Sequence, residues 1–348
     1  MILPIQGIRE FHDRNTARLS AHFVIMQFYH LFFLFAIFSC AYSAIEEKCP
    51  STNIKPCTCR TYFDGACIIT CSLSSQKDIE RIGDIPNLCD GHVHFVLVHS
   101  KVDGIPAKLW KVLLSSKTVD VTIKHAGVKG LIPPGTESIP KAYTSGEAVI
   151  KIDHSKVGEW DWKQFSNFYS EKELTLVIDD TPLSALGDDF ASIASGQVHK
   201  ITIDSTGLSS IKNQQFASFP DLSSLALQNN KLTSVSRSML AKPANKLQFL
   251  HLNGNSLTSL PEDLFSEMPA LEVVYLRDNQ LTSLPQNLLQ SVSTTLQRVD
   301  FVNNPWECNC QLLWITKNAK THLNMGMCAT PEHLANKKIR NLSSLLEC

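Results

Sequence analysis

Apolar and polar residues follow a long, fixed period between Leu222 and Asn304. The pattern L-x-x-L-x-L-x-x-N occurs there four times, as LSSLALQNN, LQFLHLNGN, LEVVYLRDN and LQRVDFVNN. The four starts, at Leu222, Leu247, Leu271 and Leu296, are 25, 24 and 25 residues apart. A period of this length is typical of a solenoid, in which each coil buries its apolar face against its neighbours.

Each repeat predicts one short strand. The alternation Leu225-x-Leu227 places two side chains on one face, and Leu222 reaches the same interior from the preceding turn. Stacked coils then share a core, where each buried apolar side chain contributes roughly 1.5–3 kcal/mol. Outer segments such as 261–268 and 285–292 begin with Pro, which helices accept at their first position. The predicted fold class is an α/β solenoid, a curved horseshoe with a parallel β-sheet on its concave face and short helices or irregular segments on its convex face.

One polar position recurs at the end of each pattern. It is occupied by Asn230, Asn255, Asn279 and Asn304, where the chain turns inward. A side-chain amide at such a turn can satisfy backbone groups that would otherwise be buried unpaired. We therefore expect these side chains to form an asparagine ladder.

Reading backwards with similar spacing extends the solenoid to about nine repeats over residues 93–304. The earlier inward pairs are Ile201/Ile203, Leu176/Ile178, Ile150/Ile152, Val121/Ile123 and Phe95/Leu97. The ladder position in these repeats holds Thr206, Thr181, Ser155, Ala126 and Ser100. Hydroxyl groups can replace part of the amide's hydrogen bonding, but the alanine cannot.

The beginning of the chain reads as a targeting segment. The apolar run 24–38 follows Arg14 and Arg18 and precedes small residues, which is typical of a secretory signal peptide over residues 1–43. Met26 begins a compact signal of its own and is an alternative start. A membrane anchor is disfavoured because the run is shorter than the ~20 apolar residues that a span needs. No later segment could span a bilayer, so we expect a secreted, extracellular protein.

Cysteines gather at the two ends of the mature chain. Without Cys40, which lies in the signal, ten cysteines remain. None of them lies in the long middle of the chain, between Cys89 and Cys308. We expect a cysteine-rich cap over residues 44–92 and another over 305–348, because the ends of a solenoid expose its core. Export favours disulfides over zinc binding. The first six cysteines are expected to pair among themselves, with their connectivity open: Cys49, Cys57, Cys59, Cys67, Cys71 and Cys89.

The repeats, with L-T-S-L-P following the ladder residue, resemble the leucine-rich-repeat family, and PWECNCQLLWI resembles the C-terminal cap of its secreted and cell-surface members. That resemblance implies the disulfides Cys308–Cys328 and Cys310–Cys348. The segment CPSTNIKPCTCRTYFDGACIITCS resembles an N-terminal cap. The whole mature chain is similar to arthropod secreted repeat proteins compared with the non-catalytic leucine-rich-repeat subunit of a shrimp (oplophorus-type) luciferase. This implies a stabilising or carrier partner for a secreted enzyme.

An aromatic and basic group is predicted on the concave face of the later repeats. Their register places these side chains on the solvent side of the strands, and Tyr and Arg are strong interface anchors. Ordinary exposed residues are the alternative. The candidate partner-binding residues of this group are Phe249, His251, Tyr275, Arg277, Arg298 and Asp300.

Two further columns cross the earlier repeats. Asp153, Asp179 and Asp204 occupy successive strands about 4.8 Å apart, so we expect a raised carboxylate pKa or a recruited cation. The hypothesis is a site for a basic or metal-dependent partner, with a solvated acidic stripe as the alternative. In the next column, His99, His125 and His154 could make a pH-sensitive contact or hold a metal, with coincidence among twelve histidines as the alternative.

Enzyme motifs such as HExxH and G-x-S-x-G are absent, so no catalytic residue, cofactor or metal ligand is assigned and no enzyme activity is expected. A sequon at Asn341 predicts glycosylation. The net charge of −1 gives no general attraction to nucleic acid or membrane. We predict an extracellular protein-binding scaffold for a secreted or cell-surface protein. The alternative is a non-catalytic auxiliary subunit in a hetero-oligomer with a secreted enzyme.

Overall fold

The computed structural model describes residues 49, 54–62, 66–85, 88–89, 91–135, 142–166, 168–170, 173–193, 197–317 and 322–348. The chain divides into two compact units, residues 1–47 and 48–348, and every described residue belongs to the second. The predicted signal peptide lies outside the described residues. Within the described ranges no helix is long and apolar enough to cross a membrane.

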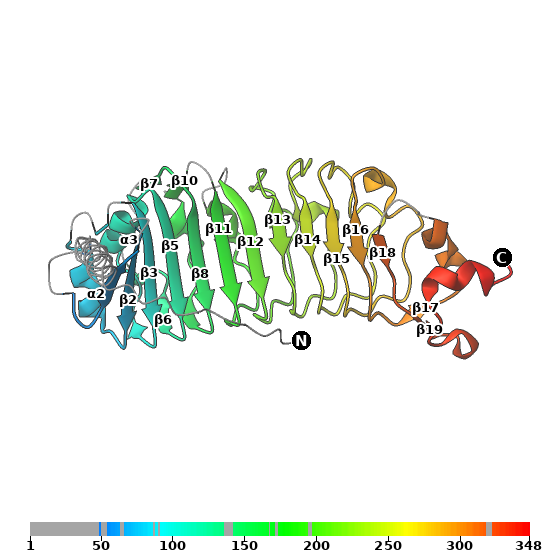
Figure 1. Cartoon of the computed structure of the whole chain (residues 1–348), viewed down its shortest axis with the longest axis horizontal. Coiled ribbons are helices and arrows are strands. Elements are labelled where there is room, and N and C mark those ends of the chain that lie inside the picture. The colour runs from blue at the N-terminus through cyan, green and yellow to red at the C-terminus, as the bar shows by residue number, and fades with distance from the viewer. Residues whose placement is uncertain are drawn as a thin grey trace, which may run out of the picture. The chain divides into compact units, whose positions relative to one another are not determined.

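Twelve strands of the described chain form one sheet, which runs through the second unit in the order of the sequence (Figure 1). The first two strands are antiparallel, and every later neighbour is parallel. The strands are β1 (Thr58–Thr61), β2 (Cys67–Ser72), β3 (His92–Val98), β5 (Thr118–Lys124), β8 (Ala148–Asp153), β11 (Leu174–Asp179), β12 (Val198–Asp204), β13 (Ser224–Ala226), β14 (Phe249–His251), β15 (Val273–Tyr275), β16 (Arg298–Asp300) and β18 (His322–Asn324).

The register is the one that the leucine period predicts. Phe95 lies opposite Val121, which lies opposite Ile150, and the row continues through Leu176 and Ile201. It then passes to the consensus repeats as Leu225, Leu250, Val274 and Val299. The early repeats, whose sequences depart from the consensus, therefore stack on the later ones with the same residues facing the core.

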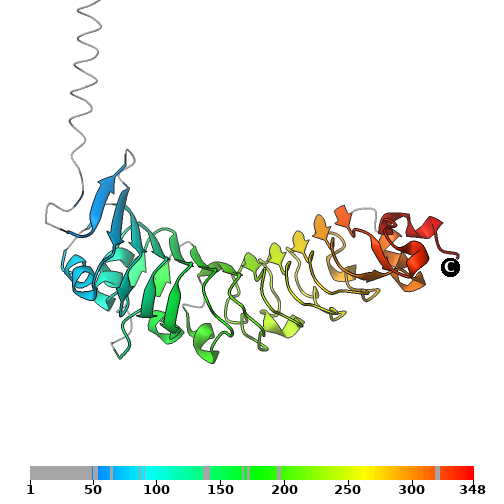
Figure 2. The ribbon, with the colours of Figure 1, turned by 90° about the horizontal axis from the view of Figure 1, so that it is seen from below.

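The return segments of the coils lie on the other side of the core (Figure 2). Within this unit the sheet follows the concave side of the curve that the coils make. The convex side carries α2 (Gln76–Ile82), α3 (Ala107–Leu114), η1 (Trp162–Phe165), η2 (Asp188–Ser192), η3 (Arg237–Met239) and η4 (Gln290–Val292). Smaller sheets pair β4 (Lys101–Val102), β6 (Gly127–Gly130) and β9 (Lys156–Glu159), and β7 (Ala142–Thr144) with β10 (Phe168–Ser170).

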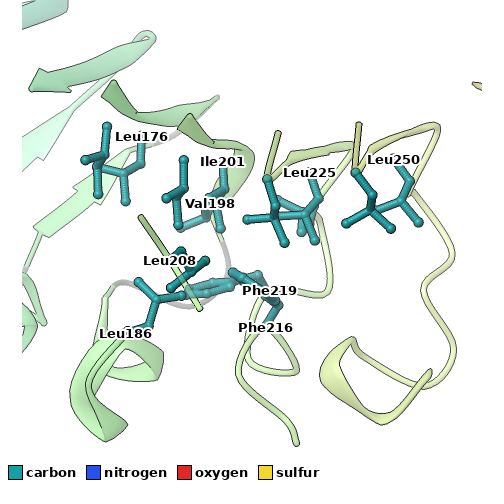
Figure 3. Packing of buried hydrophobic residues seen from close by; sticks show 14 of the residues in the cluster. Leu176, Leu186, Val198, Ile201, Leu208, Phe216, Phe219, Leu225 and Leu250 are labelled. Atoms are coloured by element: carbon teal, nitrogen blue, oxygen red, sulfur yellow. The ribbon is translucent and has the colours of Figure 1, made fainter. Parts of the chain in front are cut away.

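The core is continuous from coil to coil (Figure 3). Leu176, Ile201, Leu225 and Leu250 point inward from successive strands, and Phe216 and Phe219 meet them from the convex side. A series of edge-to-face aromatic contacts extends along this side. For example, the rings of Trp162 and Phe190 are 5.0 Å apart at 86°. Such pairs add about 0.5–1.5 kcal/mol beyond their buried area.

The ladder residues make the hydrogen bonds that their position requires. The Asn255 carbonyl oxygen accepts the Leu232 amide at 3.0 Å, and its Nδ2 donates to the carbonyls of Leu227 and Leu252 at 2.9 and 3.0 Å. In the early coils hydroxyls act instead, since Ser155 Oγ accepts the Ala126 amide at 3.1 Å. Ala126 thus keeps its place in the register, and its backbone amide is satisfied by a hydroxyl of the next coil.

A second column lies immediately before the ladder. Each of its residues follows a strand and adopts a left-handed backbone, a conformation in which Asn, Asp and His are enriched among residues other than Gly. The turn that follows each strand of the large sheet from β2 to β16 has this geometry, so the column continues through both halves of the solenoid. Its residues, with φ between 40° and 65°, are Leu73, His99, His125, His154, Asp180, Ser205, Asn229, Gly254, Asp278 and Asn303.

Disulfides close both ends of the second unit. The N-terminal bonds are Cys49–Cys59, Cys57–Cys71 and Cys67–Cys89. The C-terminal bonds are Cys308–Cys328 and Cys310–Cys348, the pairs implied by the resemblance to known caps. The C-terminal cap contains β17 (Trp306–Glu307), β19 (Cys328–Thr330), η5 (Cys310–Lys317), η6 (Glu332–Leu334) and η7 (Ile339–Ser344).

Candidate functional site

An aromatic group lies on the concave surface of strands β14 to β16. Phe249 pairs in register with Val273 and then Arg298, while His251 pairs with Tyr275 and then Asp300. Alternate residues of a strand face opposite sides, so these two rows face away from the buried Leu250 row. We call Phe249, His251, Val273, Tyr275 and Arg298 the concave patch.

The concave patch combines exposed apolar surface with a free cation. Phe249 is 36% exposed, and the rings of His251 and Tyr275 lie 4.8 Å apart. Arg298 is exposed, and within the described residues it makes no ion pair. Desolvation by burial lowers the pKa of His251, whose Nε2 has no hydrogen-bond partner in the described structure. Burial therefore favours the neutral form of this imidazole, which packs against the Tyr275 ring.

The two remaining candidates of this group have local partners. Nε of Arg277 lies 2.9 Å from Oδ2 of Asp278, the next residue. Oδ1 of Asp300 accepts the amide of Val302 at 3.1 Å. Both side chains therefore shape the turn after their strand. Val273 was not a sequence candidate, because the candidates were chosen for aromatic or charged side chains, although the register places it beside Phe249.

Asp153, Asp179 and Asp204 lie directly opposite one another on β8, β11 and β12. A partner site at all three aspartates requires accessible carboxylates. The structure corrects this expectation for Asp153, which is buried, with 4% of its surface exposed. Lys124 Nζ lies 3.1 Å from its carboxylate, and His154 Nδ1 lies 2.5 Å away. Burial raises the pKa of Asp153, but the hydrogen bonds from His154 and Lys124 outweigh it, so the pKa is lowered.

We call Asp153, Asp179 and Asp204 the acidic column. The pKa of its middle carboxylate, Asp179, shifts in the opposite direction to that of Asp153. Desolvation by burial, followed by repulsion from Asp204 and Asp153, raises the pKa of Asp179. Asp204 is satisfied by donors of the next coil, since Gln228 Nε2 and Asn229 Nδ2 lie 2.6 and 2.9 Å from it. Asp179 has no such donor among the described residues. It is therefore the position of the column where no hydrogen-bond donor of the described residues offsets the repulsion.

The three histidines of the left-handed column have neighbouring rings. The rings of His99 and His125 are 5.3 Å apart and stacked, with 5° between their planes, whereas those of His125 and His154 are 5.1 Å apart and tilted by 60°. Nε2 of His154 lies 3.0 Å from Oδ2 of Asp180. The hydrogen bond to Asp153 raises the pKa of His154, and the charges of Asp153, Asp180 and Asp179 raise it further against desolvation.

Among the described residues, no group of three or more His, Cys, Asp and Glu side chains is arranged to hold a metal ion. The histidines are instead spaced by the coils and oriented by their left-handed backbones. Asn341 is exposed at the surface of the C-terminal cap.

Comparisons with known proteins agree with this fold. Residues 245–296 match the family model described as Leucine rich repeat. A solved structure of human 5T4 (Wnt-activated inhibitory factor 1, trophoblast glycoprotein) matches with 17% identity and a TM-score of 0.52, covering 86% of this chain and 99% of that one. None of the curated proteins compared matches this sequence.

A further solved structure belongs to an octameric complex of Latrophilin 3 (Lec, Olf), Unc5D (Ig, Ig2, TSP1) and FLRT2 (LRR). It matches with 16% identity and a TM-score of 0.47, covering 81% of this chain and 96% of that one. These comparisons leave the resemblance to a luciferase subunit untested. With its family match over residues 245–296 and its stacked coils, the second unit of this chain is a leucine-rich-repeat solenoid with a cysteine cap at each end.

Proposed function

We propose that this protein is an extracellular protein-binding scaffold whose partner docks on the concave patch. The observation that carries the proposal is the exposed Phe249 ring beside Val273, Tyr275 and the unpaired Arg298. Aromatic and arginine side chains at the centre of an interface supply most of the binding energy in typical complexes. The strands that hold them pair with a neighbour on both sides, so little ordering entropy is lost on binding.

Disulfides at both ends support an extracellular setting. Cross-links such as Cys57–Cys71 and Cys308–Cys328 form and persist in oxidising compartments, and they are rare in the cytosol. The sequon at Asn341 lies on an exposed segment, as a glycosylation site in a secreted protein requires.

The acidic column adds a complementary element to the same face. A partner that places a Lys or Arg side chain near Asp179 would offset the repulsion from its two acidic neighbours. The concave face would then recognise a partner with an apolar or aromatic contact region and a basic group beside it. Charge pairing of this kind contributes more to orientation and association rate than to affinity.

The partner is best identified by purifying the native protein from its source fluid under mild conditions, with mass spectrometry of whatever elutes with it. Binding of that partner is then measured with the variant Phe249→Ala/Tyr275→Ala and with the matched convex variant Gln286→Ala/Gln290→Ala. We expect the concave variant to bind at least about 30-fold more weakly, which corresponds to about 2 kcal/mol. The convex control should bind normally.

Equal binding by the concave variant and the wild type would refute the docking site. Recovery of an enzyme at fixed stoichiometry would identify the protein as an auxiliary subunit. A protein that elutes alone would call for a screen of cell-surface and matrix proteins with the same pair of variants.

A further inference from the structure

Among the residues that the structure describes, the C-terminal cap leaves part of the end of the solenoid open. A pocket of 480 Å³ lies between the last strand of the sheet, β18, and the start of η7. Its apolar lining includes Leu323 and Met325 from the strand side and Ile315 and Ile339 from the cap. The volume falls in the range of sites that bind small ligands or a few side chains.

The edge of the sheet runs along this pocket. β18 pairs with β16 on one side, and it is the last strand in the sheet formed by the described residues. The amide of His322 donates to Gln297, and the carbonyl of Asn324 accepts from Phe301, so both residues face β16. Leu323 lies between them and presents its backbone groups to the open edge, where another strand can pair.

Within the described part of the cap, the chain closes this edge only beyond Leu323. The amide of Ile339 donates to the carbonyl of Gly326 at 3.2 Å, and Met327 forms an antiparallel bridge with Lys338. The open stretch is therefore short, and it ends where the cap chain takes over the pairing. A short extended segment fits this space, whereas a long strand would collide with residues 337–339.

The charged side chains that line the pocket are all basic. Lys338 and Arg340 line it, and the lining contributed by described residues contains no Asp or Glu. Both cations are exposed, and neither makes an ion pair within the described ranges. Charge complementarity therefore selects an anionic occupant whose apolar side chain can enter between Leu323 and Ile339.

We propose that this pocket binds a short, extended acidic segment of a partner protein, which adds to the edge of β18 and places carboxylates against Lys338 and Arg340. Backbone pairing provides affinity in this mode of recognition, and the pocket provides specificity for alternate side chains. The site does not depend on the concave patch, so it holds whether or not a partner docks there.

The probe is a capped, fluorescein-labelled peptide in which Asp alternates with Leu, compared with a matched peptide in which Lys replaces Asp. We expect the full chain to bind the acidic peptide saturably by fluorescence anisotropy and not the basic one. The variant Lys338→Glu/Arg340→Glu should weaken binding at least tenfold. The control Lys156→Glu/Lys163→Glu makes the same change of charge on exposed residues of another coil and should bind normally.

Hydrogen exchange locates the bound peptide. Bound peptide should slow amide exchange in residues 322–327, and Phe249→Ala/Tyr275→Ala should leave both readouts unchanged. Equal binding of both peptides, no saturable binding or protection elsewhere would each overturn the proposal. So would displacement of the peptide by oleate, which would make the pocket a lipid-anion site, or burial of the same edge by a second copy of the chain in sedimentation experiments.

Discussion

His154 and Asp180 form an ion pair between neighbouring coils, with 3.0 Å between Nε2 and Oδ2. The other ring nitrogen of His154 lies 2.5 Å from Asp153, so the imidazole bridges a buried and an exposed carboxylate. Both His154 and Asp180 have left-handed backbones, which direct their side chains along the same column. A backbone requirement of the turn thus brings a titratable group to a site where its charge is stabilised.

The first prediction is pH-dependent stability from His154. Its pKa is raised above the usual 6.5 in the folded state, so its contribution to the free energy of unfolding is fully present below pH 6.5. That contribution is lost as pH rises through the folded pKa. His154→Asn, which suits the left-handed backbone, should therefore cost more stability at pH 5.5 than at pH 8.5.

Urea unfolding of the two proteins at both pH values measures this difference. Asp180→Asn removes one partner of the imidazole and should reduce the pH dependence without abolishing it. An equal loss of stability for His154→Asn at the two pH values would show that the ion pair contributes nothing.

The second prediction concerns Asp179. Because desolvation and two neighbouring carboxylates raise its pKa, the charged form is disfavoured in the folded state. Asp179→Asn should raise the free energy of unfolding at pH 7 by about 0.5 kcal/mol, the scale of a like-charge pair on a sheet. The gain should disappear below the usual Asp pKa of 3.8, where the carboxylate is protonated in both states. Thermal unfolding at pH 7 and pH 3 tests both statements, and a loss of stability at pH 7 would contradict them.

The third prediction concerns the ladder. Asn255→Ala removes one acceptor and two donors from buried backbone groups, and we expect it to lower the free energy of unfolding by about 1–3 kcal/mol or more. The adjacent exposed Ser256→Ala should change it by less than about 0.5 kcal/mol. The comparison is made by urea unfolding with the disulfides intact, and similar values for the two variants would argue against the ladder.

The fourth prediction concerns the C-terminal cap. Cys308→Ser/Cys328→Ser removes a bond across 20 residues of sequence and should cost about 2–5 kcal/mol of unfolding free energy. Because the cap covers the last coil, hydrogen exchange should accelerate first in residues 298–317, whereas 201–227 should remain protected. Uniform acceleration through the whole solenoid would show that its coils unfold as a single cooperative unit.

The sequence by itself determined the repeat, the inward rows and the ladder. A leucine that recurs about every 25 residues must face the interior of a solenoid, and the period carries that face from Leu225 back to Phe95 despite drift. It also placed the three aspartates and the three histidines in columns, because residues at equivalent positions of stacked coils become neighbours.

Tertiary structure alone decided what those neighbours do. Asp153 and Asp179 are equivalent in sequence, yet the pKa of one is lowered and that of the other raised. The reason is that Lys124 and His154 cover Asp153, whereas the groups around Asp179 include two carboxylates. The pocket beside Leu323 also depended on tertiary structure, since it forms only where the returning cap chain stops short of the open edge. Pairings between distant segments, and the burial they create, set these properties, and no local pattern in the chain encodes them.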